Sequence, residues 1–219
     1  MIRIQKELCK VRQRFIEISS TVENTLKKTV QSVLEMDTKL AEEIIENEKI
    51  IDKMEVDLEE ECLKVLALYQ PVATDLRFII ALLKINNDLE RIGDLSEHIA
   101  KKVLHISKKE KEMVPFPFNF KKMSSVTLSM LKKSIDALLS FNSQEAYEVL
   151  ELDNKIDLIH KQMFRKVEKL IMESPQKTAL MIDIVGISRY MERIADHITN
   201  ISEDVIYMTD GEIIRHNRN

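Results

Sequence analysis

The segment Glu90-Arg91-Ile92-Gly93-Asp94 returns, with one change, as Glu192-Arg193-Ile194-Ala195-Asp196. Apolar residues three or four positions apart surround both copies, and this spacing predicts that each copy lies within a long helix. At the residue frequencies of this chain, chance would repeat the four shared residues in about one sequence in a hundred. An internal duplication is the better explanation, so the fold is expected to consist of two related halves.

The composition indicates that both halves are helical. Of 219 residues only 3 are glycine and 4 are proline, while 44% are hydrophobic and 32% are charged. Few turn-forming residues and many apolar ones are typical of long helices around a substantial core. We therefore predict an all-α fold, a tandem repeat of two antiparallel three-helix bundles.

Residues that end or begin helices recur at matching places in the two halves. Pro71 and Pro175 each follow a second helix, where a proline ring ends one helix and suits the first turn of the next. Asp37 is expected to cap the start of the second helix, and Gly211 to mark the end of the last one. These signals predict three helices in each half.

The stretch between the halves disfavours helix formation. It contains Val114-Pro115-Phe116-Pro117-Phe118, with two prolines in five residues. We predict a linker at residues 108–118, which separates a first three-helix repeat at 1–107 from a second at 119–215.

Charge and cysteine content exclude several classes of protein. A formal net charge of -4 without a basic stripe argues against nucleic acid as the main partner. Cys9 and Cys62 stand far from any thiol or histidine at metal-binding spacing, and they are interpreted as reduced core residues. No run approaches the ~20 apolar residues that span a bilayer. The chain is expected in a reducing cytoplasm.

Acidic residues recur in pairs four positions apart, a spacing that places both carboxylates on the same side of a helix. In each half one pair lies on the predicted middle helix and another on the predicted last helix. The pairs are Glu48 with Asp52 and Glu90 with Asp94 in the first half, and Asp153 with Asp157 and Glu192 with Asp196 in the second. Solvated helix faces also carry such pairs, but their matching positions in both halves favour a shared role.

The physical consequence depends on whether two pairs converge. Carboxylates about 5 Å apart repel by roughly 3 kcal/mol at an effective dielectric near 20, so four together favour a bound cation. All-oxygen ligation suits magnesium, manganese or ferric iron. His98, one turn after Asp94, could add a nitrogen ligand, although histidines at such positions more often face solvent.

The order of these motifs and the residues around them resemble the PhoU family of phosphate-signalling proteins over nearly the whole chain. The matching segments are Gln70-Pro71-Val72-Ala73-Thr74-Asp75-Leu76-Arg77, Asp88-Leu89-Glu90-Arg91-Ile92-Gly93-Asp94 and Asn200-Ile201-Ser202-Glu203-Asp204-Val205, together with the four acid pairs. The resemblance implies that Glu48, Asp52, Glu90, Asp94, Asp153, Asp157, Glu192 and Asp196 hold iron, zinc or magnesium in two clusters, one for each bundle.

The resemblance also implies regulation by protein binding rather than catalysis. Such proteins act in the cytoplasm with a phosphate ABC transporter, through its ATPase subunit, and with a membrane sensor kinase, and they dampen the phosphate-starvation response. They reach the membrane only through these partners. We also expect a homodimer, because Leu76, Ile79, Leu83, Ile182 and Val185 lie away from the predicted core stripe, although they could instead contact neighbouring helices.

Two other functions stay open at this point. A plain helical scaffold would carry the same acids on solvated faces. A ferritin-like di-iron carboxylate enzyme would also place acids on a helix bundle, but it needs a Glu-x-x-His motif on each of two helices. Asp157-x-x-His160 is the nearest approach in this chain.

Overall fold

The computed structural model describes residues 2–109 and 116–212, with side chains from residue 4 onward. Long α-helices account for nearly all of this part of the chain, which confirms the predicted all-α class. The helices are α1 (Ile2–Glu35), α2 (Thr38–Tyr69), α3 (Ala73–Lys109), α4 (Phe120–Ser140), α5 (Ser143–Glu173) and α6 (Thr178–Asp210), with a single 3-10 turn, η1 (Pro175–Lys177), before α6.

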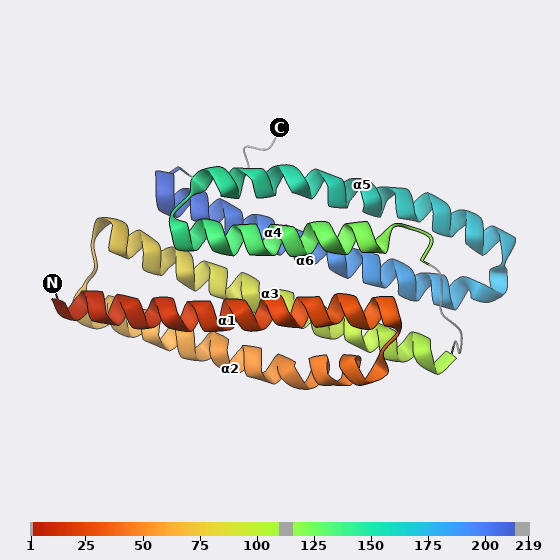
Figure 1. Cartoon of the computed structure of the whole chain (residues 1–219), viewed down its shortest axis with the longest axis horizontal. Helices are drawn as coiled ribbons and strands as arrows, with labels where there is room; N and C mark the ends of the chain where they lie inside the picture. The colour runs from red at the N-terminus through yellow and green to blue at the C-terminus, as the bar shows by residue number, and fades with distance from the viewer. Residues whose placement is uncertain (1, 110–115, 213–219) are drawn as a thin grey trace.

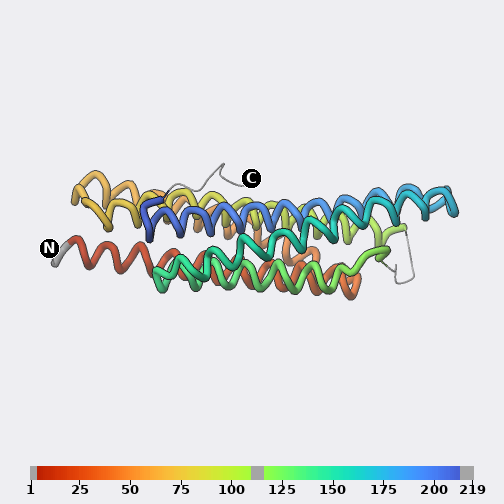
Figure 2. Tube along the Cα trace, turned by 90° about the horizontal axis from the view of Figure 1, so that it is seen from above, coloured from red at the N-terminus to blue at the C-terminus, as the bar shows by residue number. Residues whose placement is uncertain are grey.

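The helices form two antiparallel three-helix bundles that lie side by side (Figure 1). Helices α1, α2 and α3 make the first bundle, and α4, α5 and α6 make the second. The bundles meet mainly through α3 and α6, with a smaller contact between α1 and α4. They are offset along the long axis, so the α2–α3 turn projects at one end and the α5–α6 turn at the other (Figure 2).

The helix ends follow the signals in the sequence. Asp37 caps α2, because its Oδ1 accepts hydrogen bonds from the backbone N–H groups of Lys39 and Leu40 at 2.9 and 3.1 Å. Gly211 ends α6 in the left-handed conformation with φ of 76°. The predicted linker lies partly outside the described residues, which lack 110–115, and the predicted repeat boundaries stay predictions.

A close approach between α2 and α3 sets the geometry of the first bundle. Gly93 of α3 is buried, and a Cβ atom at this position would lie only 3.1 Å from Cδ1 of Ile51 on α2. Ile51 is itself buried in the hydrophobic core. The absent side chain of Gly93 therefore lets the two helices pack closely where their acidic residues face each other.

Ion pairs cross the joint between the bundles. On α6, Asp183 is buried and contacts two residues of α3, Lys102 Nζ and His105 Nδ1, each at 2.8 Å. Further along the same joint, His197 Nδ1 of α6 lies 2.8 Å from Asp88 Oδ1 of α3. The α3–α6 joint therefore combines apolar packing with charges that are paired within the described structure.

The residues considered for self-association have different surroundings. Ile79 is fully buried, and Leu83 and Val185 are half-buried against the core. Leu76 and Ile182 are exposed, at 38% and 58%. The homodimer stays a prediction, and of these five residues only Leu76 and Ile182 are exposed enough to contact a second copy of the chain.

Within residues 2–109 and 116–212, no helix combines the length and the apolar character that crossing a bilayer requires.

Replacing Asp183 tests the joint. Burial alone would raise the pKa of Asp183, but hydrogen bonds from Lys102 and His105 hold it below its usual value. The charged form therefore stabilises the fold above the pKa of an ordinary aspartate, and this stabilisation is lost as the pH falls through the lowered pKa. Asp183→Asn is expected to lower the free energy of unfolding by about 1–3 kcal/mol at neutral pH.

Urea unfolding at neutral pH and near pH 3 measures this effect, with exposed Asp136→Asn on α4 as the control. The deficit of the Asp183 variant should shrink in acid, and a deficit that is equal at both pH values would contradict the charged joint.

Candidate metal centre

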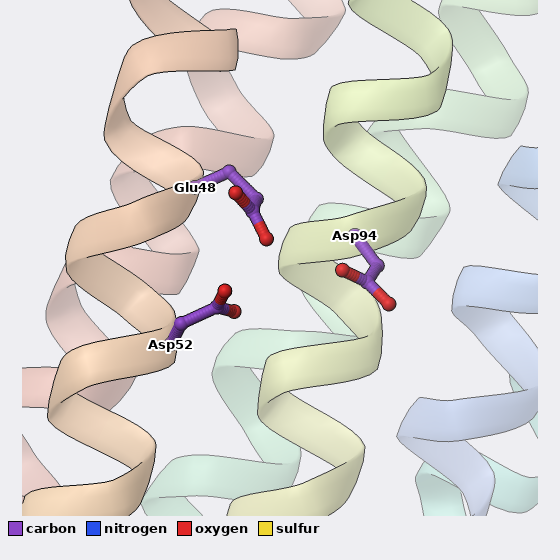
Figure 3. Close-up of side chains that lie close together, drawn as sticks. All are labelled: Glu48, Asp52 and Asp94. Carbon is purple, nitrogen blue, oxygen red and sulfur yellow. The ribbon is translucent and has the colours of Figure 1, made fainter.

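Three of the predicted site residues come together between α2 and α3. Glu48 and Asp52 project from successive turns of α2, and Asp94 comes from α3 (Figure 3). One carboxylate oxygen from each lies within 4.8 Å of the oxygens of the other two. Glu48 and Asp94 are half-buried and Asp52 is exposed, so the cluster lies in a seam that is open to solvent. We call these three residues the seam cluster.

Burial and the neighbouring acids change how Glu48 titrates. Burial raises the pKa of Glu48 to about 7, together with its hydrogen bond to Asp52 and the nearby charges of Asp52, Glu97 and Asp94. A proton shared between Glu48 and Asp52 therefore relieves the repulsion near neutral pH. A cation placed among the same oxygens would relieve it more completely.

Glu90 lies one helical turn before Asp94 on α3. Burial raises the pKa of Glu90, and the charge of Asp94 raises it further. Its Oε2 is buried without a hydrogen-bond partner, although Nε of Arg91 lies 3.3 Å away without hydrogen-bonding geometry. A terminal guanidinium nitrogen of Arg91, Nη1, donates a hydrogen bond to Asp94 Oδ2 at 2.9 Å. Half of the Arg91 side chain is exposed, so this ion pair lies at the solvent-facing edge of the seam.

The donors in this region fit a hard metal ion. Glu48, Asp52, Glu90 and Asp94 offer only carboxylate oxygens. The buried Oε2 of Glu90 has no hydrogen bond, and a cation beside this oxygen would compensate for the missing donor. Magnesium, manganese and ferric iron favour such ligands. Glu97 borders the cluster as well, and sequence reasoning missed it, although its position one turn after Asp94 is a visible signal.

The second bundle gathers its acids less closely. Burial raises the pKa of Glu192 on α6, and the charge of Asp157 on α5 adds to this, so these two motifs do face each other. Across the described residues, however, Asp153, Asp157, Glu192 and Asp196 do not provide three ligand atoms within 4.8 Å of one another. The two halves therefore share the motif positions but differ in how tightly the carboxylates converge.

Within residues 2–109 and 116–212, the histidines lie in contacts between helices. The His98 ring lies 5.4 Å from the ring of Tyr190 on α6, and His98 is outside the seam cluster. His160 Nδ1 is 2.9 Å from Ser188 Oγ, and burial lowers the pKa of His160. The contacts of His160 with Ser188 and of His197 with Asp88 place both histidines in the packing between helices.

Comparisons with known proteins identify relatives of this chain. The profile of the PhoU domain matches the chain twice, at residues 15–103 and 120–205. A phosphate-specific transport system accessory protein PhoU homolog of Aquifex aeolicus is 33% identical over 98% of this chain and 96% of its own length.

Solved structures show the same fold. The crystal structure of PhoU from Pseudomonas aeruginosa matches with a TM-score of 0.91 and 31% identity, over 95% of this chain and 99% of that one. The phosphate transport system regulatory protein PhoU from Streptococcus pneumoniae matches with a TM-score of 0.86 and 29% identity, over 96% of this chain and 98% of that one.

The raised pKa of Glu48 predicts an unusual pH dependence for the metal-free protein. Between the unfolded pKa of 4.5 and the folded value of about 7, the folded state keeps a proton that the unfolded state releases. Stability therefore falls as the pH rises through this window. Glu48→Gln is expected to stabilise the protein by about 1 kcal/mol at pH 8 and by less at pH 5.

Urea unfolding in the presence of a chelator measures the difference. The exposed residue Glu46 on the same helix provides the control, Glu46→Gln, which removes the same charge outside the seam cluster. If Glu48→Gln changes the free energy of unfolding by the same amount as Glu46→Gln at pH 5 and at pH 8, the repulsion in the seam is absent.

Proposed function

Because the chain belongs to the PhoU family, we propose that it regulates phosphate uptake and dampens the phosphate-starvation response by binding other proteins. The observation that carries this proposal is the double match to the PhoU domain, each match falling on one three-helix bundle. Relatives of the chain are named accessory and regulatory proteins of phosphate transport. Their names describe regulators rather than enzymes.

The proposed partners are the ATPase subunit of a phosphate ABC transporter and a phosphate sensor kinase. The protein would work in the cytoplasm as a homodimer and reach the membrane only through these partners. Two features support a role in binding rather than in chemistry. Long helices present extended faces to a partner, and the seam cluster consists of three carboxylates rather than a nucleophile with its base.

We also propose that the acid pairs hold metal ions, iron, zinc or magnesium, with Glu48, Asp52, Glu90 and Asp94 in the first bundle. The counterparts in the second bundle are Asp153, Asp157, Glu192 and Asp196. A bound ion would supply positive charge between α2 and α3. These residues would then hold the two helices at a fixed separation, and the face that they share would lose most of its negative charge.

Metal content tests the proposed sites directly. Glu90→Gln with Asp94→Asn removes two charges from the first bundle while nearly keeping its shape, and less metal is expected in the purified variant. The matched control is Glu42→Gln with Glu46→Gln, two exposed acids at the same spacing on α2. Elemental analysis of protein purified without added metal, followed by titration with magnesium, makes the comparison. Equal metal content in all three proteins would argue for a plain scaffold.

A starvation reporter tests the regulatory role. In a bacterial host that lacks its own regulator of this kind, the native chain should lower reporter expression several-fold when phosphate is plentiful. The Glu42 and Glu46 double variant should do the same. A reporter that stays high although the native chain accumulates would contradict the proposal, and oxygen consumption by the iron-loaded protein would instead favour a carboxylate enzyme.

A further inference from the structure

Helices α2 and α5 each leave one side uncovered. Within the described residues, α2 contacts only α1 and α3, and α5 contacts only α4, α6 and η1, so neither touches the other bundle. Their uncovered sides carry apolar residues two helical turns apart, Val56 with Leu63 on α2 and Phe164 with Met172 on α5. All four side chains are at least 48% exposed. Apolar residues that gather on an exposed face mark a surface that a partner can cover.

The charges beside these apolar residues have opposite signs in the two halves. When the acid pairs of the halves are aligned, residues 56–67 of α2 correspond to residues 161–172 of α5. The first stretch holds four acids and one lysine, a net charge of -3, and the second holds four basic residues and one acid, a net charge of +3. We call these two stretches the acidic segment and the basic segment. The net charge of the whole chain hides both.

Part of the charge on each segment stays unpaired. In the described part of the chain, no ion pair involves Glu59 or Glu60 of the acidic segment, and none involves Arg165 or Lys166 of the basic segment. All four residues are exposed. The ion pairs that other residues of these segments form within their own bundle are long, between 3.6 and 3.8 Å. Charges of this kind are free to steer and orient an oppositely charged partner.

The two segments lie at opposite ends of the molecule. The acidic segment leads into the projecting α2–α3 turn, and the basic segment leads into the projecting α5–α6 turn (Figure 2). They cannot meet within one chain. Two chains that run antiparallel bring each acidic segment beside the basic segment of the other copy, so the contact forms twice around a two-fold axis. Leu76 and Ile182, the exposed members of the predicted dimer contact, belong to the same two ends.

We propose that a second copy of this chain covers these surfaces, with the acidic segment of each copy against the basic segment of the other. This inference rests on the homodimer in the proposed function and names the surfaces that form it. The exposed apolar side chains would lose their contact with water at the centre of each contact, and the unpaired charges would surround them. A second copy is the partner that the charges favour, because the chain itself carries both complementary segments.

Charge reversal on one segment and then on both tests the contact. Glu59→Lys with Glu60→Lys makes both segments basic, and Arg165→Glu with Lys169→Glu makes both acidic. Either pair of substitutions should raise the dissociation constant of the dimer about tenfold or more, because like charges then face each other. All four substitutions in one chain exchange the two signs and keep the net charge, so the affinity should return toward that of the native chain.

Sedimentation of the full chain over a range of concentrations gives the dissociation constant for each variant. The matched control is Glu42→Lys with Glu46→Lys, two exposed acids at the other end of α2, which should dimerise as the native chain does. Circular dichroism shows whether each variant is folded. Recovery of the dimer in the variant with all four substitutions also excludes misfolding as the cause of the losses.

The outcomes separate this inference from the proposed function. If the native chain dimerises and neither charge reversal weakens it, or if exchanging the signs restores nothing, the contact is wrong and the homodimer stands. A native chain that stays monomeric at every concentration contradicts both, and the starvation reporter still decides the regulatory role. If the native chain stays monomeric and binds phosphatidylglycerol vesicles, while the Arg165 and Lys169 variant does not, the basic segment faces anionic lipid and the inference is wrong.

Discussion

The close packing of α2 against α3 is the constraint on which the candidate site depends. Ile51 lies against the bare backbone of Gly93, and this contact brings the acidic sides of the two helices within reach of each other. The gain from burying Ile51 is set against the repulsion between Glu48, Asp52 and Asp94. The apolar core thus enforces a charge arrangement that these carboxylates would avoid if they were free to separate, and such an arrangement favours a cation.

Helix α3 connects this site to the rest of the molecule. One side of it carries Glu90 and Asp94 toward α2, and another carries Asp88, Lys102 and His105 toward α6. A shift of α3 that changed the acidic seam would also strain the ion pairs at the joint, because one rigid helix carries both. The shared helix therefore couples the geometry of the acidic seam in the first bundle to the geometry of the α3–α6 joint.

Much of this arrangement is visible in the sequence, and the reason lies in helical geometry. The spacing of apolar residues, the cap at Asp37 and the glycine after α6 depend on residues close together in the chain, and the structure confirms them. Contacts between helices depend on register, which spacing along one helix leaves undetermined. For this reason the contact between the His98 and Tyr190 rings, the burial of Asp183 and the looser acids of the second bundle emerged only from the structure. The metal ligands themselves stay predictions.

The offset between the two bundles has a consequence for local stability. In the middle of the molecule every long helix has neighbours from its own bundle, and α3 and α6 also support each other. The projecting α2–α3 and α5–α6 turns lie beyond the other bundle (Figure 2). Opening a helix end there breaks fewer tertiary contacts than opening the centre. Amide hydrogens should therefore exchange fastest at the two tips and slowest around the joint, so that protection decreases from the middle of the molecule toward both ends.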